Sequence, residues 1–221
     1  MSDRDSFIDE VTEEVRRDRL FALMRRWGWV AVLAVLLLVG AAAWFEWTRA
    51  QERQRAEALG DAIIAALDKD EAEARAEALG AIDAESAGGE AVLRLLTAGE
   101  EAAAGQDEQA VDALEGISTD GDLPEIYRQI ATYKALIRQG DSVDPATRRQ
   151  GFETLAQPGS ALRLLAEEQL ALLDVETGET EAAIERLRTI VADAEVTAGL
   201  RRRASQLIVA LGGDPAAVSQ G

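Results

Sequence analysis

Two patterns of apolar residues divide the chain. From Trp27 to Phe45 no residue is charged, whereas beyond residue 46 apolar side chains recur every three or four positions. In residues 200–211, for example, apolar residues follow the i, i+4, i+7, i+8, i+11 spacing of an amphipathic helix. No segment after residue 46 shows the alternation that indicates a β-strand. The pattern predicts one uniformly apolar helix followed by an all-α domain.

The uncharged stretch has the length of a membrane span. As a helix, residues 27–45 extend over roughly 28 Å at about 1.5 Å per residue, close to a hydrocarbon core of about 30 Å. Every tryptophan in the chain lies at one end of it, and indole rings favour the headgroup boundary. We therefore predict a transmembrane helix whose interface anchors are Trp27, Trp29, Trp44 and Trp47.

Basic residues around this helix predict its orientation. Between residues 46 and 57 three arginines are interleaved with three glutamates, whereas the upstream side is richer in arginine. Cytoplasmic flanks collect Lys and Arg, so residues 1–26 are predicted to be a cytoplasmic tail and residues 46–221 to lie outside, in the periplasm if the cell has two membranes. The residues that set this topology are Arg16, Arg17, Arg19, Arg25 and Arg26.

A cleaved signal peptide is the competing interpretation, because Ala41-Ala42-Ala43 resembles a small-residue cleavage site. The region before it is long, and about half of its charged residues are acidic. The apolar run also exceeds the usual core of about 7–15 residues. We favour the uncleaved anchor. Ile8, Val11 and Val15 lie at helical spacing, so the tail is either an amphipathic helix or a solvated stub, and we slightly favour the stub.

Charge and residue usage narrow the class of function. Residues 1–26 hold six arginines and seven acidic residues, so 17 of the 18 net negative charges fall in residues 46–221. Such a domain repels nucleic acid. The chain has neither Cys nor His, which removes thiol chemistry, the commonest general base and the commonest metal ligand. We expect no enzyme, no cofactor and no metal, and the lack of Cys suits an oxidising compartment.

Apolar spacing and punctuating glycines define the helices that we expect after the membrane span. The first could continue the membrane helix, and the last would cap the array because a terminal repeat must cover an exposed apolar face. Asp144 is predicted to cap the helix that starts at Pro145. The predicted helices are 46–68, 70–84, 88–104, 106–117, 124–139, 145–157, 160–177, 180–194 and 197–211.

The glycines also suggest a repeat. Gly105, Gly140 and Gly178 lie 35 and 38 residues apart, near the 34-residue period of tetratricopeptide repeats. GQDEQAVDALEGI from Gly105 matches GETEAAIERLRTI from Gly178, at an offset of 73 residues. We predict a tetratricopeptide-like α-solenoid of about four helix pairs plus a C-terminal capping helix. The alternative is an irregular helical bundle with accidental periodicity.

Few side chains suggest a binding site, and the partner-binding residues stay unknown. Tyr127 and Tyr133 could anchor an interface, although Tyr133 lies on the apolar stripe and is favoured as core. The run at 201–203 is three arginines, which we interpret as a solvated face rather than a contact for an acidic partner. The carboxylates are expected on exposed faces beside arginines, as in Glu181 with Arg186 and Glu185 with Arg188.

The whole architecture resembles a known family. A short tail, a basic-flanked helix ending in Trp44-Phe45-Glu46-Trp47 and a degenerate tetratricopeptide-like domain are similar to the YfgM-like proteins, ancillary subunits of the SecYEG translocon in the bacterial inner membrane. The opening DSFIDEVTEEVRRDRLFALMRRWGW resembles the alphaproteobacterial versions. The resemblance covers essentially the whole chain, and it supplies no catalytic residues.

The resemblance implies a single-pass inner-membrane protein whose periplasmic domain is a non-catalytic adaptor. Its implied partners are the SecYEG translocon, a membrane-anchored, prolyl-isomerase-like periplasmic chaperone and newly exported polypeptides. A scaffold for another envelope assembly complex, such as cytochrome maturation or cell division, is the alternative, because those systems also use anchored tetratricopeptide-like domains. Oligomeric state is not predicted.

Overall fold

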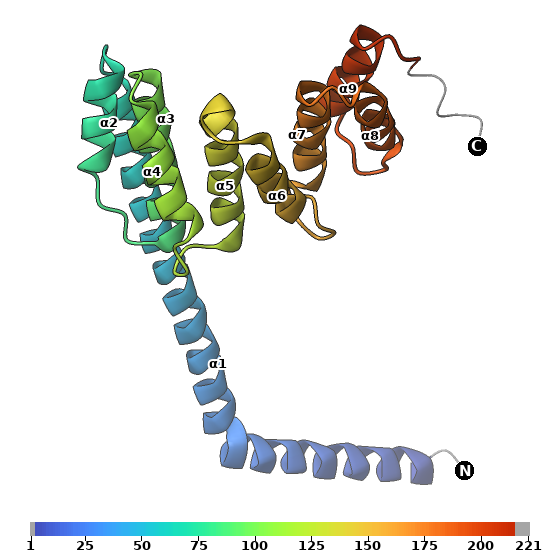
Figure 1. Ribbon diagram of the computed structural model, residues 1–221. Helices are drawn as coiled ribbons and strands as arrows, with labels where there is room; N and C mark the ends of the chain where they lie inside the picture. The colour runs from blue at the N-terminus through green and yellow to red at the C-terminus, as the bar shows by residue number, and fades with distance from the viewer. Residues whose placement is uncertain (1–2, 215–221) are drawn as a thin grey trace. The chain divides into compact units, whose positions relative to one another are not determined.

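The computed structural model describes the backbone of residues 3–214 and, apart from Ala31 and Asp141, the side chains of residues 29–214. The described residues form nine α-helices and one 3₁₀ turn, with no β-strand among them, which confirms the all-α prediction (Figure 1). The chain divides into two compact units, one ending at Ala58 and one beginning at Leu59.

The first helix, α1 (Asp3–Leu67), is continuous through both predicted boundaries of the membrane span. No proline precedes residue 124, and glycine occurs in α1 only at three positions, so nothing in the sequence interrupts the i to i+4 hydrogen bonds. The predicted helix 46–68 is the C-terminal part of α1, which confirms that it continues the apolar helix. The tail backbone is helical from Asp3 onward, as in the helical alternative for this segment.

Eight further helices and one 3₁₀ turn follow, and most of the predicted bounds agree with them within two residues. They are α2 (Ala72–Gly80), α3 (Ala87–Ala103), α4 (Asp107–Ser118), α5 (Glu125–Gln139), η1 (Gly140–Ser142), α6 (Pro145–Leu155), α7 (Arg163–Glu176), α8 (Thr180–Ala192) and α9 (Ala198–Ala210).

Two helices are shorter than predicted by more than two residues, and local hydrogen bonds explain why. The helix α2 ends at Gly80, where the N–H of Ile82 turns back to donate to the carbonyl of Leu79 at 3.2 Å. The start of α7 is delayed to Arg163 because the Ser160 hydroxyl accepts from the N–H of Leu162 at 3.2 Å, which holds a turn there.

The predicted helix ends hold. Gly105, Gly178 and Gly212 have φ of 77°, 84° and 81°, the left-handed values that glycine adopts without a Cβ clash. Gly140 differs, since its φ of 44° is combined with a ψ of −130°, outside the left-handed helical region. The Asp144 carboxylate accepts from the N–H groups of residues 146 and 147 at 3.0 and 3.3 Å, which confirms the predicted N-cap.

The core of the second unit consists of four successive clusters. They are formed by the end of α1 with α2 and α3, by α3 with α4 and α5, by α5 with α6 and α7, and by α7 with α8 and α9. The helices α3, α5 and α7 each contribute to two clusters. The large apolar side chains buried most completely in them are Leu79, Ile117, Phe152, Leu170, Leu187, Ile190 and Ile208.

The 73-residue sequence match corresponds to equivalent positions in α4 and α8. The residues before the two helices, Gln106 and Glu179, have nearly identical backbone angles (φ −90°, ψ 57° and φ −87°, ψ 53°). Three matched pairs of side chains are buried in both helices. They are Ala110 with Ala183, Leu114 with Leu187, and Ile117 with Ile190.

Candidate functional site

The apolar part of α1 is exposed along its length. Between Val32 and Leu67 the helix is long and apolar enough to cross a membrane, and none of its apolar window is buried. Trp29 is 67% exposed and Trp44 is 64% exposed. A core helix of a soluble domain would bury such a surface, because exposed apolar area is costly in water. Within the part of the chain that the structure describes, this confirms the coarse prediction of one candidate membrane helix near the N-terminus.

The predicted interface anchors are only partly visible. The Trp44 and Trp47 rings contact each other with centroids 5.6 Å apart, and the Thr48 hydroxyl donates to the carbonyl of Trp44 at 3.1 Å. The side chain of Trp27 lies outside the described residues. So do the side chains of the predicted topology-setting residues Arg16, Arg17, Arg19, Arg25 and Arg26.

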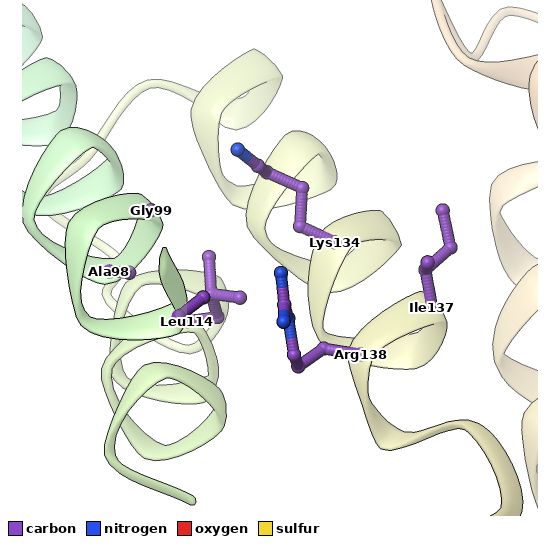
Figure 2. A pocket seen from close by; sticks show the side chains of 7 residues that line it. Ala98, Gly99, Leu114, Lys134, Ile137 and Arg138 are labelled. Atoms are coloured by element: carbon purple, nitrogen blue, oxygen red, sulfur yellow. The ribbon is translucent and has the colours of Figure 1, made fainter. Parts of the chain in front are cut away.

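A groove of about 170 Å³ lies between α3, α4 and α5 (Figure 2). Lys134 and Arg138 extend from α5 toward α3 and α4, and Leu114 faces them from α4. Ile137 projects from the opposite side of α5 and is 46% exposed. The lining residues are Ala98, Gly99, Ala102, Leu114, Lys134, Ile137 and Arg138.

The two cations of the groove differ in their partners. The Arg138 guanidinium donates to the Asp107 carboxylate at 2.8 Å. Lys134 is exposed, and no carboxylate of the described residues lies within ion-pair distance of its ammonium. It is one of only two lysines in a chain with 41 acidic residues. The groove therefore combines apolar walls with an available positive charge.

A smaller hollow of about 70 Å³ lies on the other side of Ile137, between α5, α6 and α7. Tyr133 supports it, because its ring packs edge-on against Phe152 with centroids 5.9 Å apart and its hydroxyl accepts from Gln169 at 3.3 Å. Burial raises the pKa of Tyr133. These contacts confirm Tyr133 as a core residue. Leu172, 40% exposed, lines the hollow from α7.

A larger hollow of about 300 Å³ lies beside α2 and α3. Asp83, Glu90 and Arg94 line it together with Leu79 and Leu93. Arg94 already forms ion pairs with two carboxylates, Asp120 at 2.7 Å and Glu90 at 3.6 Å. This hollow therefore offers a partner less uncompensated positive charge than the groove at Lys134.

Two carboxylates of the described residues are buried, contrary to the prediction that the acidic residues lie on exposed faces. Asp174 on α7 is 1% exposed and accepts from Arg149 of α6 at 2.6 Å and from Arg186 of α8 at 3.1 Å. The predicted pairing of Arg186 with Glu181 is wrong, since a spacing of five residues places them on different helix faces. Arg188 does approach Glu185, at 3.8 Å.

The second buried carboxylate corrects the interpretation of the arginine run. Glu168 on α7 is 6% exposed, and the Arg203 guanidinium donates to both of its oxygens, at 2.9 and 2.7 Å. This bidentate bond raises the pKa of Arg203. Arg201 and Arg202 are exposed, as predicted for a solvated face. Arg203 instead connects α9 to α7 through this ion pair.

A further repeat feature was not found in the sequence. Asp120, after α4, and Asp193, after α8, are also 73 residues apart. The carboxylate of each accepts a hydrogen bond from the backbone N–H two residues later. Asp120 also pairs with Arg94 of α3, and Asp193 with Arg163 of α7. The bond from Arg94 is the main cause that lowers the pKa of Asp120, and the backbone N–H of Glu195, followed by Arg163, lowers that of Asp193. The two arginines do not align at this offset, so no residue match signals the pairing.

Residues 29–214 contain no group of three or more acidic side chains placed to hold a metal ion. Comparisons of the chain with protein-family models, with characterised proteins and with solved structures give no match. The geometry of α1 and of the groove is therefore the basis for a functional proposal.

Proposed function

We propose that this protein is a non-catalytic, membrane-anchored adaptor that binds other proteins. The observation that carries the proposal is the exposed apolar segment of α1, which continues without a break into a helical unit. A single helix of this kind keeps a folded domain close to a bilayer and raises its effective concentration near membrane partners. The arginine-rich upstream flank favours a cytoplasmic N-terminus and a periplasmic domain at the bacterial inner membrane.

The helical unit is proposed to be a degenerate tetratricopeptide-like stack. Support comes from the shared burial pattern of α4 and α8 and from the recurring turns at Asp120 and Asp193. It also comes from the core, in which each cluster joins neighbouring helices only. Stacked helix pairs commonly bind partner segments in a groove, and the groove at Lys134 and Ile137 is the surface that we assign to binding.

The resemblance to the YfgM-like proteins is the reason to place this adaptor at the Sec translocon. There it would assist a periplasmic prolyl-isomerase-like chaperone and newly exported polypeptides. An apolar groove with a free cation suits segments that are transiently unfolded, since these expose apolar side chains before they fold.

The proposal is tested by photo-crosslinking in intact cells. A photoreactive amino acid replaces Ile137, which borders the groove at its α5 edge, and a matched variant carries it at Asp112, which is exposed on α4 outside the groove lining. We expect translocon subunits and a periplasmic chaperone to be captured from position 137 and not from position 112. Capture of cytochrome-maturation or division proteins without the translocon would contradict the adaptor proposal and favour the scaffold.

Orientation is measured separately, and the absence of cysteine makes this simple. Thr12→Cys and Asp112→Cys are labelled in intact cells with a membrane-impermeant maleimide that passes the outer membrane. We expect labelling at position 112 alone. Labelling at position 12 alone would reverse the proposed topology.

A further inference from the structure

The outer face of α1 in the second unit carries an exposed apolar side chain between two carboxylates. Ile64 is 67% exposed, the highest value for a large apolar side chain among the described residues from 59 to 214. Asp61 and Asp68 lie three residues before and four after it, so one helix face presents all three. Neither aspartate has an ion-pair partner among the described residues. We call this face the Ile64 stripe.

The Ile64 stripe matches the groove in size and in charge. A groove of about 170 Å³ is smaller than the roughly 300–1,000 Å³ of a small-molecule site and suits one branched side chain. Its unpaired cation, Lys134, can face either aspartate, because Asp61 and Asp68 each lie about one helical turn from Ile64. Gly99 at its edge has no atom within 4 Å of a Cβ position, so a helix backbone can approach closely.

The geometry points to a second copy of this chain as the occupant of the groove. The Ile64 stripe of one copy would insert Ile64 against Leu114, with an aspartate opposite Lys134. This contact goes beyond the proposed adaptor function and rests only on the membrane anchoring that it includes. Anchored copies share one surface, so a weak contact is strengthened by the raised local concentration.

Charge complementarity between the Ile64 stripe and the groove favours a second copy of the chain over another occupant. The domain is strongly acidic, so long-range charge opposes self-association and a specific contact needs opposite charges at the point of approach. The stripe and the groove supply them, and both belong to the same compact unit. An extended client segment is the other possible occupant, and the experiment distinguishes the two.

The experiment uses the full-length chain, which has no native cysteine. Ile64→Cys and Ile137→Cys proteins, one carrying a size tag, are mixed in liposomes and treated with a short bismaleimide. The matched control replaces the second protein with Val209→Cys, whose site is 60% exposed on α9. We expect the 64–137 heterodimer to form at least about five times faster than the 64–209 heterodimer, the factor that a free energy of about 1 kcal/mol supplies.

Charge-reversal variants distinguish cross-linking through a specific contact from cross-linking through random collision. Lys134→Glu on the Ile137→Cys protein should slow cross-linking by about fivefold, as expected for loss of a partly exposed ion pair. Asp61→Lys with Asp68→Lys on the Ile64→Cys protein should restore it. All of these positions are exposed, so folding is expected to survive, and circular dichroism checks it.

Equal rates for the 64–137 and 64–209 mixtures, or no rescue by the reversed charges, would overturn the inference. If position 137 then links to a different polypeptide in intact cells, the groove holds a client and not a second copy. That outcome would leave the adaptor function standing, whereas a 64–137 contact without translocon capture would fail only the adaptor function.

Discussion

The Arg203 guanidinium donates hydrogen bonds to both oxygens of the buried Glu168 carboxylate, at 2.9 and 2.7 Å, and so joins α9 to α7. The Glu168 side chain is 7% exposed, whereas that of Arg203 is 53% exposed. The buried carboxylate is therefore paired with a guanidinium that is itself half exposed to water.

Arg203→Leu is expected to destabilise the protein by about 1–3 kcal/mol, because it leaves a buried carboxylate without its donors. The exposure of Arg203 places the effect toward the lower end, since water screens the pair. Urea unfolding of the two variants measures it, with Arg202→Leu as the matched control, for which we expect a change within about 0.5 kcal/mol. Equal midpoints for both variants would show that the bond contributes nothing. Adding Glu168→Leu should recover most of the loss.

The stability contributed by Asp193 should depend on pH in the opposite sense to that of a buried, unpaired acid. Hydrogen bonds from the N–H of Glu195 and from Arg163 lower its pKa below the ordinary 3.8. Its contribution to stability is therefore present above pH 3.8 and is lost as the pH falls through the lowered value. We expect Asp193→Asn to be less stable than wild type at pH 7 and to converge with it in strong acid. Asp112→Asn, on an exposed site, should show no such convergence because it starts without a difference.

Glu101 should show the reverse trend. Its Oε2 atom is buried without a hydrogen-bond partner, and burial raises its pKa above the ordinary 4.5. A raised pKa means that the folded state is favoured below pH 4.5 and loses stability as the pH rises through the raised value. Glu101→Gln should therefore raise the urea midpoint at pH 7 and leave it unchanged near pH 3. An exposed control, Glu108→Gln, separates this effect from loss of net charge. A lower midpoint for Glu101→Gln at pH 7 would reveal a stabilising partner.

Glycines inside helices offer a test of packing. A Cβ on Gly151 of α6 would lie 2.7 Å from both terminal carbons of Leu136, so the Leu136 side chain between α5 and α6 would have to move. Gly151→Ala is expected to cost about 1 kcal/mol or more, as overpacking does. A Cβ on Gly116 of α4 meets only Arg94, at 3.5 Å, so Gly116→Ala should gain about 0.5–1 kcal/mol through helix propensity. The order of the two unfolding midpoints checks the prediction, which fails if Gly151→Ala is the more stable.

Local chemistry predicted most helix bounds. Glycines with positive φ ended helices at Gly105 and Gly178, and Asp144 capped α6, because each signal acts within one turn of the residue that carries it. The register between α4 and α8 was also readable, since the same apolar side chains face inward in both.

The ion pairs between helices could not be predicted in this way. Asp174 is held by arginines 25 residues before it and 12 after it, and Arg203 reaches back 35 residues to Glu168. Spacing along one helix carries no information about partners on other helices. A charged residue on a helix is also expected outside, so burial of Glu168 and Asp174 appears only when α6, α8 and α9 pack around α7. For the same reason the groove at Lys134, built by three helices, had no linear signature.

The division of the core into four clusters has a mechanical consequence. Each cluster is closed by consecutive helices, and α9 contributes only to the last of them. A force applied at the C-terminal end would peel α9 away from α7 and α8 before it loaded the clusters nearer to α1. The unit would then unfold in steps, and the helices nearest to α1 in the chain would be the last to unfold.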